Sequence, residues 1–91
     1  MLTSRFKDMM VYSKDMVKLG KVKDLEFNPT EMKVTDFIVE FEKDPAKEVL
    51  GKMVVIGHAK GKVPVTAVES IKDALNLQQP LSGLKKAFES V

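Results

Sequence analysis

The segment from Lys18 to Glu42 constrains the fold most, because it has the pattern of two β-strands joined by a turn. Side chains alternate between the two faces of a strand, and Phe37, Val39 and Phe41 fall on one face of the second strand. We expect this apolar face to line a core. Residues 28–31 (Asn-Pro-Thr-Glu) have turn chemistry, since proline fixes φ and asparagine can bond back to the backbone. The sequence therefore predicts a β-hairpin.

The first strand of this hairpin alternates less regularly than the second. Leu25 and Phe27 share one face, whereas a strict alternation would place Val22 on the opposite face. One extra residue near Lys23 and Asp24 would return Val22 to the apolar side. A β-bulge inserts such a residue and also bends the strand. We therefore expect a bulge at this point.

Shorter elements are expected on both sides of the hairpin. The predicted strands are residues 10–12, 53–56, 63–65 and 73–77, with a loop or single helical turn at 43–48, a turn at 58–62 and one tight turn at 66–71. Residues 73–77 could also continue as helix, but Leu75 and Leu77 alternate around a polar residue, which favours a strand. A chain of 91 residues has room for one domain and one modest core. Because closing a small sheet removes its edges, we predict an all-β fold, a small antiparallel β-barrel of about six short strands with a short C-terminal helix.

Composition excludes several classes of protein. Apolar residues make up 44% and charged residues 31%, which is typical of a soluble globular protein and not of a disordered chain. No apolar run approaches the roughly 20 residues that span a bilayer, and the start of the chain lacks the apolar stretch of a secretory signal. The chain has no cysteine, which excludes disulfides and thiolate chemistry. We expect a cytoplasmic protein that does not insert into a membrane.

Neither a catalytic centre nor a metal site is predicted. His58 is the only histidine, and it lacks both a second zinc ligand and a nucleophile that it could activate. Glu40 and Glu42 share a strand face, but a hard cation needs more converging oxygen atoms. Asp24 is interpreted as an acceptor for backbone amides and not as a functional carboxylate. The sequence therefore indicates a non-enzyme without a cofactor.

The charge balance of the chain does not favour nucleic acid as a partner. The formal net charge is only +2, and the chain has 14 lysines but a single arginine. Arginine is the residue that makes bidentate hydrogen bonds to bases and phosphates. The lysines could still gather on one face and bind RNA or an acidic partner. Those considered are Lys18, Lys21, Lys23, Lys52, Lys60 and Lys62. Acidic residues interrupt this series, so a scattered solvated surface is favoured, and an RNA- or ribosome-associated role is kept as the alternative function.

Residues 20–27 (GKVKDLEF) followed by residues 33–39 (KVTDFIV) resemble the PRC-barrel domain family. The family has a G-x-V-x-D strand, matched here by Gly20, Val22 and Asp24, and then a second apolar strand. Its closing pattern is a proline, a short turn, and an aspartate before an apolar strand. Val63, Pro64, Val65, Val68, Ile71 and Asp73 with the residues up to Leu77 match that pattern in order. The likeness covers about Phe6 to Leu77. Departures are the missing Asp-Gly turn before the G-x-V-x-D strand and a longer segment at 44–51.

The resemblance implies a β-barrel of the SH3-like size class that serves as a docking module. We therefore expect a barrel domain at residues 1–79 and an amphipathic tail at 80–91. The family occurs in the photosynthetic reaction-centre H subunit, in a ribosome-maturation factor and as stand-alone archaeal proteins, some of them associated with cell division as adaptors to the membrane-anchoring protein SepF. This chain is similar to the stand-alone type. What the resemblance implies is a protein–protein adaptor, with a homodimer and a SepF-like partner as expectations.

The tail carries an apolar stripe at helical spacing. Leu84, Phe88 and Val91 recur at i, i+4 and i+7, Leu81 precedes them, and Ser82 can cap the helix. Burial of each large apolar side chain is worth about 1.5–3 kcal/mol, so we expect these residues to be covered. Two alternatives stay open. The tail folds over its own barrel, or it binds a second subunit or a partner.

Overall fold

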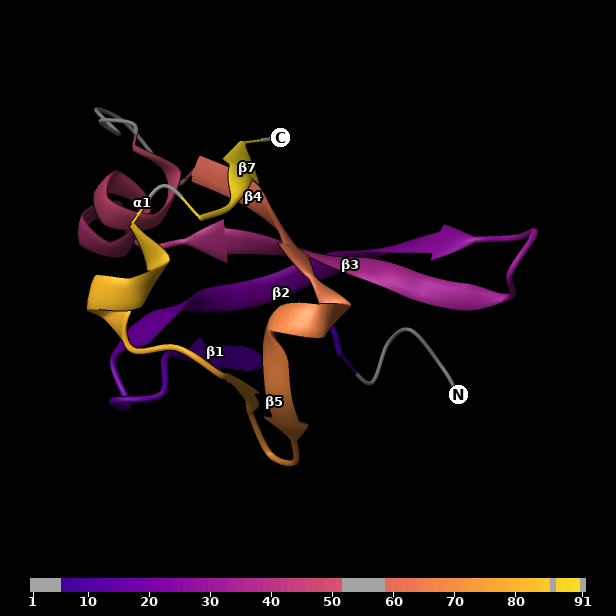
Figure 1. Cartoon of the computed structure of the whole chain (residues 1–91), viewed down its shortest axis with the longest axis horizontal. Coiled ribbons are helices and arrows are strands. Elements are labelled where there is room, and N and C mark those ends of the chain that lie inside the picture. Colours follow the sequence, from indigo (N-terminus) through magenta and orange to yellow (C-terminus); the bar gives the residue numbers. More distant parts are fainter. Residues whose placement is uncertain (1–5, 52–58, 86, 91) are drawn as a thin grey trace.

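The computed structural model describes residues 6–51, 59–85 and 87–90, and it is mostly β-structure (Figure 1). The strands are β1 (Met10–Tyr12), β2 (Lys18–Asn28), β3 (Lys33–Phe41), β4 (Ala59–Pro64), β5 (Val68–Ile71), β6 (Leu75–Leu77) and β7 (Glu89–Ser90). One helix, α1 (Lys43–Leu50), follows β3, and two 3-10 turns are η2 (Val65–Ala67) and η3 (Leu81–Leu84). The predicted strand at 53–56 lies outside the described residues.

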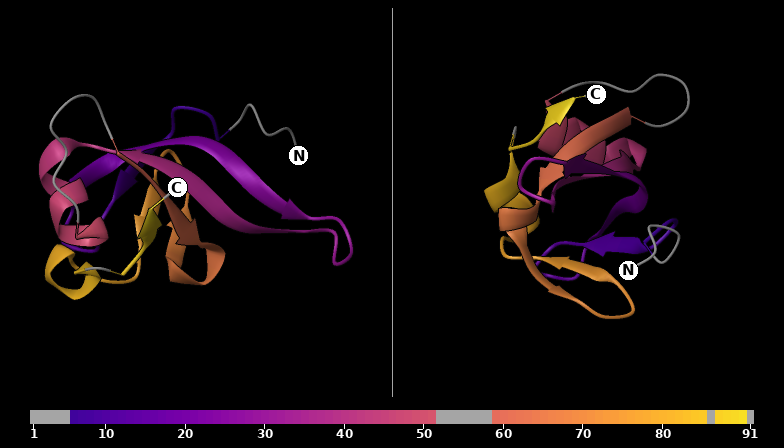
Figure 2. Two further views of the ribbon diagram at one scale, coloured as in Figure 1. Left: turned by 90° about the horizontal axis from the view of Figure 1, so that it is seen from above. Right: turned by 90° about the vertical axis from the view of Figure 1, so that its right-hand side faces the viewer.

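All of these strands belong to one sheet, in the order β5-β6-β1-β2-β3-β4-β7. The sheet curls into a half-barrel, as the end-on view of Figure 2 shows. Neighbouring strands are antiparallel except β1 and β6, which run parallel. The prediction of a purely antiparallel barrel is therefore wrong in this respect. Parallel neighbours need a long connection, and here β2 to β5 lie between the two strands.

The core lies inside the curl of the sheet. Val22, Phe37, Val39 and Phe41 are at most 2% exposed, as the alternation predicts. The remaining fully buried side chains of the core include Val11, Leu19, Ala46, Val49, Val63, Leu75 and Leu77. Together these residues join β1, β2, β3, β4, β6 and α1 into one apolar cluster.

The predicted hairpin is confirmed, together with its bulge and its turn. The β2–β3 register moves from Val22↔Val39 to Asp24↔Ile38, so Lys23 is the extra residue that brings Val22 onto the core side. In the turn, the side-chain oxygen of Asn28 accepts the backbone N–H of Thr30 (2.9 Å). A second irregularity, between Glu26↔Asp36 and Phe27↔Val34, was not predicted and leaves Thr35 unpaired on β3.

Helix α1 is longer than the loop or single turn predicted for residues 43–48. Pro45 is its third residue. The first N–H groups of a helix have no partner within the helix, so proline costs no hydrogen bond at this position. Gly51 ends the helix in the left-handed conformation (φ 67°). Ala46 and Val49 are fully buried, so packing against the sheet stabilises this short helix.

Residues 59–62, predicted as a turn, instead form most of β4. Gly61 is buried and pairs with Val39 of β3 and Ser90 of β7, so the glycine serves close packing between two strands. The tight turn predicted for 66–71 is only η2, which begins one residue earlier and leads directly into β5. Strand β6 confirms the extended interpretation for residues 75–77, whereas residues 73 and 74 lie in the bend before it.

The predicted C-terminal helix is wrong. Residues 81–84 form the 3-10 turn η3, and residues 89–90 add β7 to the edge of β4. Glycine in a helix interior is unfavourable by about 1 kcal/mol, and Gly83 occupies that position in the tail. The tail folds over its own sheet: Leu84 is 3% and Phe88 7% exposed, and the Phe88 ring stacks on Phe41 at 6.1 Å between centroids.

Candidate interaction surface

The backbones of β2 and β3 approach each other very closely at Gly20, which pairs with Phe41. A Cβ atom at this position would lie 2.1 Å from the carbonyl oxygen of Glu40 and 2.8 Å from the Cα of Phe41. Only glycine therefore allows the two backbones to approach so closely. Gly20, the first residue of the G-x-V-x-D pattern, is thus a structural requirement of this close approach.

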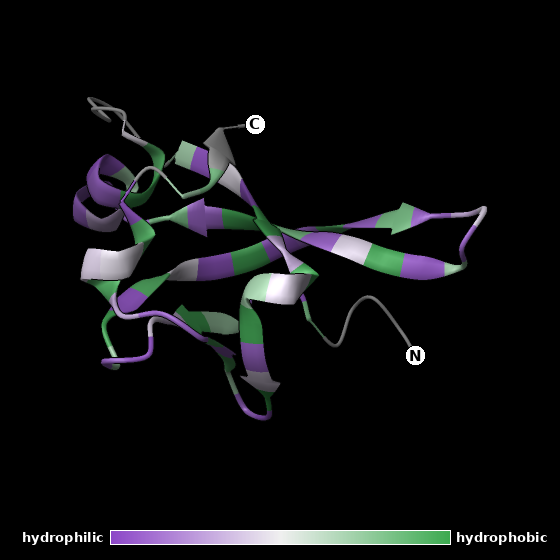
Figure 3. Ribbon diagram, in the orientation of Figure 1, coloured by the Kyte–Doolittle hydropathy of each residue, from purple (hydrophilic) through white to green (hydrophobic). Residues whose placement is uncertain are grey.

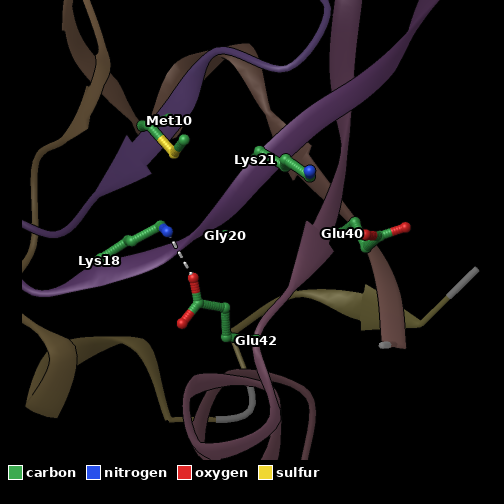
Figure 4. Close-up of a pocket in the computed structure, with 6 residues that line it drawn as sticks. All are labelled: Met10, Lys18, Gly20, Lys21, Glu40 and Glu42. Atoms are coloured by element: carbon green, nitrogen blue, oxygen red, sulfur yellow. Dashed lines mark ion pairs between the residues drawn. The ribbon is translucent and has the colours of Figure 1, made fainter. Parts of the chain in front are cut away.

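Charged side chains surround a hollow of about 140 Å³ beside Gly20 (Figure 4). Its lining residues are Met10, Lys18, Gly20, Lys21, Glu40 and Glu42. Lys18 and Glu42 form an ion pair across the hollow, with 2.9 Å between Nζ and Oε2. The hydrogen bond from Lys18 to Glu42 raises the pKa of the lysine, which stays charged. The groups at this hollow neutralise each other and leave no single sign of charge to attract a ligand.

The lysines expected to gather on one face are matched by carboxylates. Glu40 of β3 lies between Lys21 of β2 and Lys60 of β4 in cross-strand register. Lys62 pairs with Glu26 at 3.1 Å, and Lys23 pairs with Asp8 at 2.9 Å. The Asp8 hydrogen bond raises the pKa of Lys23, and the same contact lowers the pKa of Asp8. Lys52 lies outside the described residues, so the five described lysines form a surface of alternating charge.

The far half of the β2–β3 hairpin extends beyond the body of the molecule (Figures 1 and 2). We call residues 23–36 the arm. Leu25 pairs with the core residue Phe37, and Phe27, two residues further along β2, pairs with Val34. The core-facing apolar row therefore continues along the arm, where hydrophobic and hydrophilic residues alternate (Figure 3). Phe27 is 53% exposed, and Met32 at the tip is 73% exposed.

Among residues 6–51, 59–85 and 87–90, no group of three or more histidine, aspartate or glutamate side chains could hold a metal ion. Across the same ranges, the helices are too short or too polar to cross a bilayer. His58 lies outside the described residues. Asp24 accepts the backbone N–H of Leu25 (2.8 Å), in agreement with its interpretation as a structural acceptor.

The sequence of the chain was compared with models of known protein families. The model of the PRC-barrel domain matches residues 1–82. The chain belongs to the PRC-barrel family. No curated protein matches it.

The PRC-barrel match covers β1 to β6 and α1, and it ends inside η3. The tail beyond residue 82 nevertheless contributes Leu84 and Phe88 to the core of this PRC-barrel protein. A partner could reach these two side chains only if the tail left its own sheet. Leu81 is partly buried and lines an open groove of about 510 Å³ with Val17 and Pro45. Val91 lies outside the described residues, and the partner-binding hypothesis for the tail stays a prediction.

Asp73, the last aspartate of the PRC-barrel pattern, is exposed in the bend between β5 and β6, next to the backbone hydrogen bond from Lys72 to Ala74 (3.1 Å). Its role as a structural motif residue stays a prediction. The residues that sequence reasoning missed are Phe27 and Met32, whose exposure depends on where the neighbouring strands end. The signal for them in the sequence was the alternation of apolar residues on both sides of the hairpin turn.

Proposed function

We propose that this PRC-barrel protein is a non-catalytic protein-binding module. The observation that carries the proposal is the arm, which projects from the body with Phe27 and Met32 largely exposed. A two-stranded ribbon alone is at best marginally stable in water, so a partner that covers the exposed side chains of the arm would stabilise it. The curled sheet corresponds in this proposal to a small barrel of the SH3-like size class.

The family resemblance supports a more specific role. Stand-alone archaeal PRC-barrel proteins include adaptors in cell division, and we propose that this chain acts in the cytoplasm as a homodimeric adaptor with a SepF-like protein as its partner. One fold serves many functions, so this assignment rests on the family and not on a residue of the arm.

Isothermal titration of the full chain with the SepF-type protein of the same organism tests the proposal. We expect saturable binding with a defined stoichiometry, and no comparable binding of single- or double-stranded RNA at the same salt concentration. Preferential binding of RNA, or no binding of the SepF-type protein, would contradict the proposed role. Light scattering of the chain alone measures the homodimer independently.

A further inference from the structure

We propose that the edge of β2 at residues 23–28, which no strand of the described residues covers, is a docking edge for one extended strand of a partner protein in which apolar and basic residues alternate. The inference rests on the proposed function and names the surface and the chemistry of the partner. Strand addition of this kind obtains affinity from main-chain hydrogen bonds and specificity from alternate side chains.

The first observation is that this edge of β2 lacks a neighbouring strand in the described part of the chain. Strand β1 pairs with β2 only between Lys18 and Lys21. The backbone of Asp8 and Met9 extends this contact by one residue, through two hydrogen bonds with Val22 (2.6 and 2.9 Å). Beyond Val22, β2 continues to Asn28 with hydrogen-bonding partners on the β3 side alone within the described ranges. An added strand would therefore continue the sheet where β1 stops.

The second observation is the apolar row on the core-facing side of this edge. Leu25 and Phe27 are two residues apart in β2, and the register shift near them leaves the extra residue, Thr35, on β3 and not on β2. They therefore share a face. Leu25 packs against the core, and Phe27 is 53% exposed at the end of the row. Apolar side chains on alternate positions of an incoming strand would cover them.

The third observation is the charge on the opposite face. Asp24 and Glu26 alternate with the apolar row, and Asp36 lies directly across from Glu26. Like charges opposite one another destabilise a strand pair, and Lys62 is the cation that pairs with Glu26. The arm contains two lysines and four carboxylates, so its net charge is −2 although the whole chain carries +2. Basic side chains on the other alternate positions of the incoming strand would complement this face.

At this edge a side chain already accepts a backbone hydrogen bond that an added strand could take over. The carboxylate of Asp24 accepts the N–H of Leu25 at 2.8 Å, in the place that a carbonyl of an added strand would take. Charges and bulges on an edge strand also protect it from aggregation. Protection from aggregation does not explain Phe27, because an exposed aromatic ring on an edge strand favours aggregation.

The acidic face also disfavours a second copy as the occupant. In antiparallel pairing of two identical edges, a register centred on Leu25 places Asp24 opposite Glu26 of the other copy. A register centred on Glu26 places the two Glu26 side chains opposite each other. Both arrangements bring like charges together, which is destabilising. A basic strand avoids this repulsion.

Short synthetic peptides test the inference on the full chain by fluorescence anisotropy. The probes are a labelled peptide of alternating valine and lysine, its valine–glutamate counterpart, and the valine–lysine peptide N-methylated at alternate residues so that one edge cannot donate. We expect the valine–lysine peptide to bind at least about tenfold tighter than the other two, since each tenfold step corresponds to about 1.4 kcal/mol. Equal binding of the N-methylated peptide, or no binding of the first peptide, would overturn the inference.

Variants of the arm locate the contact and separate it from other surfaces. Phe27→Ala should weaken binding of the valine–lysine peptide about tenfold, whereas Met32→Ala, at the tip beyond the edge, should change it little. Glu26→Lys combined with Asp36→Lys should reverse the preference toward the valine–glutamate peptide. Glu69→Lys combined with Asp73→Lys, at two exposed positions away from the arm, is the control with the same change of charge. Loss of specificity in this control, or a concentration-dependent mass of the chain that Phe27→Ala abolishes, would contradict the inference. Binding of the SepF-type protein without peptide binding would refute the docking edge and leave the proposed function standing.

Discussion

At the scale of the residue, Gly20 lies where the backbones of β2 and β3 approach each other closely. A Cβ atom there would lie 2.1 Å from a main-chain oxygen that cannot move aside, whereas a Cβ at Gly83 would meet first the flexible side chain of Gln79, at 3.0 Å. We expect Gly20→Ala to lower the free energy of unfolding by about 1–3 kcal/mol or more, as overpacking does. Gly83→Ala is the matched control and should change it little. Urea denaturation measures both variants. Equal free energies of unfolding would show that the backbones of β2 and β3 can move apart at Gly20 without a loss of stability.

Asp15 joins the turn before β2 to the tail. Its carboxylate accepts the hydroxyl of Ser13 and the N–H of Leu81 (3.2 Å), and the Ser13 hydrogen bond is the main reason that the pKa of Asp15 lies below its ordinary value of 3.8. A folded-state pKa below the unfolded one stabilises the protein above the unfolded pKa, and this stability is lost as the pH falls through the folded pKa. Asp15→Asn should therefore show a smaller fall in Tm between about pH 4 and pH 2 than the unaltered chain. Parallel Tm curves in that range, measured by circular dichroism, would contradict this assignment.

At the scale of the element, local patterns predicted some features and long-range contacts decided the rest. The bulge at Lys23 was predictable because Val22 is out of phase with its strand, but Val34 and Thr35 suit either face of a strand and give no such sign. Gly61 looked like a turn residue, yet its role depends on two strands distant in sequence. The candidate interaction edge was hidden for the same reason, since it exists only because β1 ends its pairing at Lys21.

The tail shows the same limit, and its packing gives a prediction. The spacing of Leu84 and Phe88 fits a helix, but the ring of Phe88 stacks on Phe41 and its backbone N–H bonds to the carbonyl of Val49 (3.3 Å). Phe88→Ala should lower the free energy of unfolding by about 3–5 kcal/mol, because it leaves a cavity in the core. Lys85→Ala, a substitution at an exposed position three residues before Phe88, should stay within about 0.5 kcal/mol of the unaltered chain. Equal effects of the two variants in chemical denaturation would mean that the tail does not belong to the core.

At the scale of the whole molecule, a packed body and a projecting arm share the same two strands. Val22 and Phe41 lie in the core, whereas the arm has apolar packing on at most one side and ends in exposed side chains. Regions with few buried apolar contacts open at lower free energy than the core does. Amide hydrogens of residues 24–35 should therefore exchange at least about 100-fold faster than those of residues 19–22 and 37–41, which corresponds to about 2.7 kcal/mol.

Hydrogen exchange followed by mass spectrometry resolves these segments, and addition of the valine–lysine peptide extends the comparison. An occupied docking edge should slow exchange at residues 23–28, while β5, which lies at one end of the sheet, should be unaffected. Uniform protection along the hairpin in the free chain would mean that the arm is as stable as the body and needs no partner. The docking edge predicts faster exchange along the whole arm in the free chain, and slower exchange only in β2 once the peptide is added. That result would show that the apolar row, the acidic face and the backbone edge of β2 bind the same peptide.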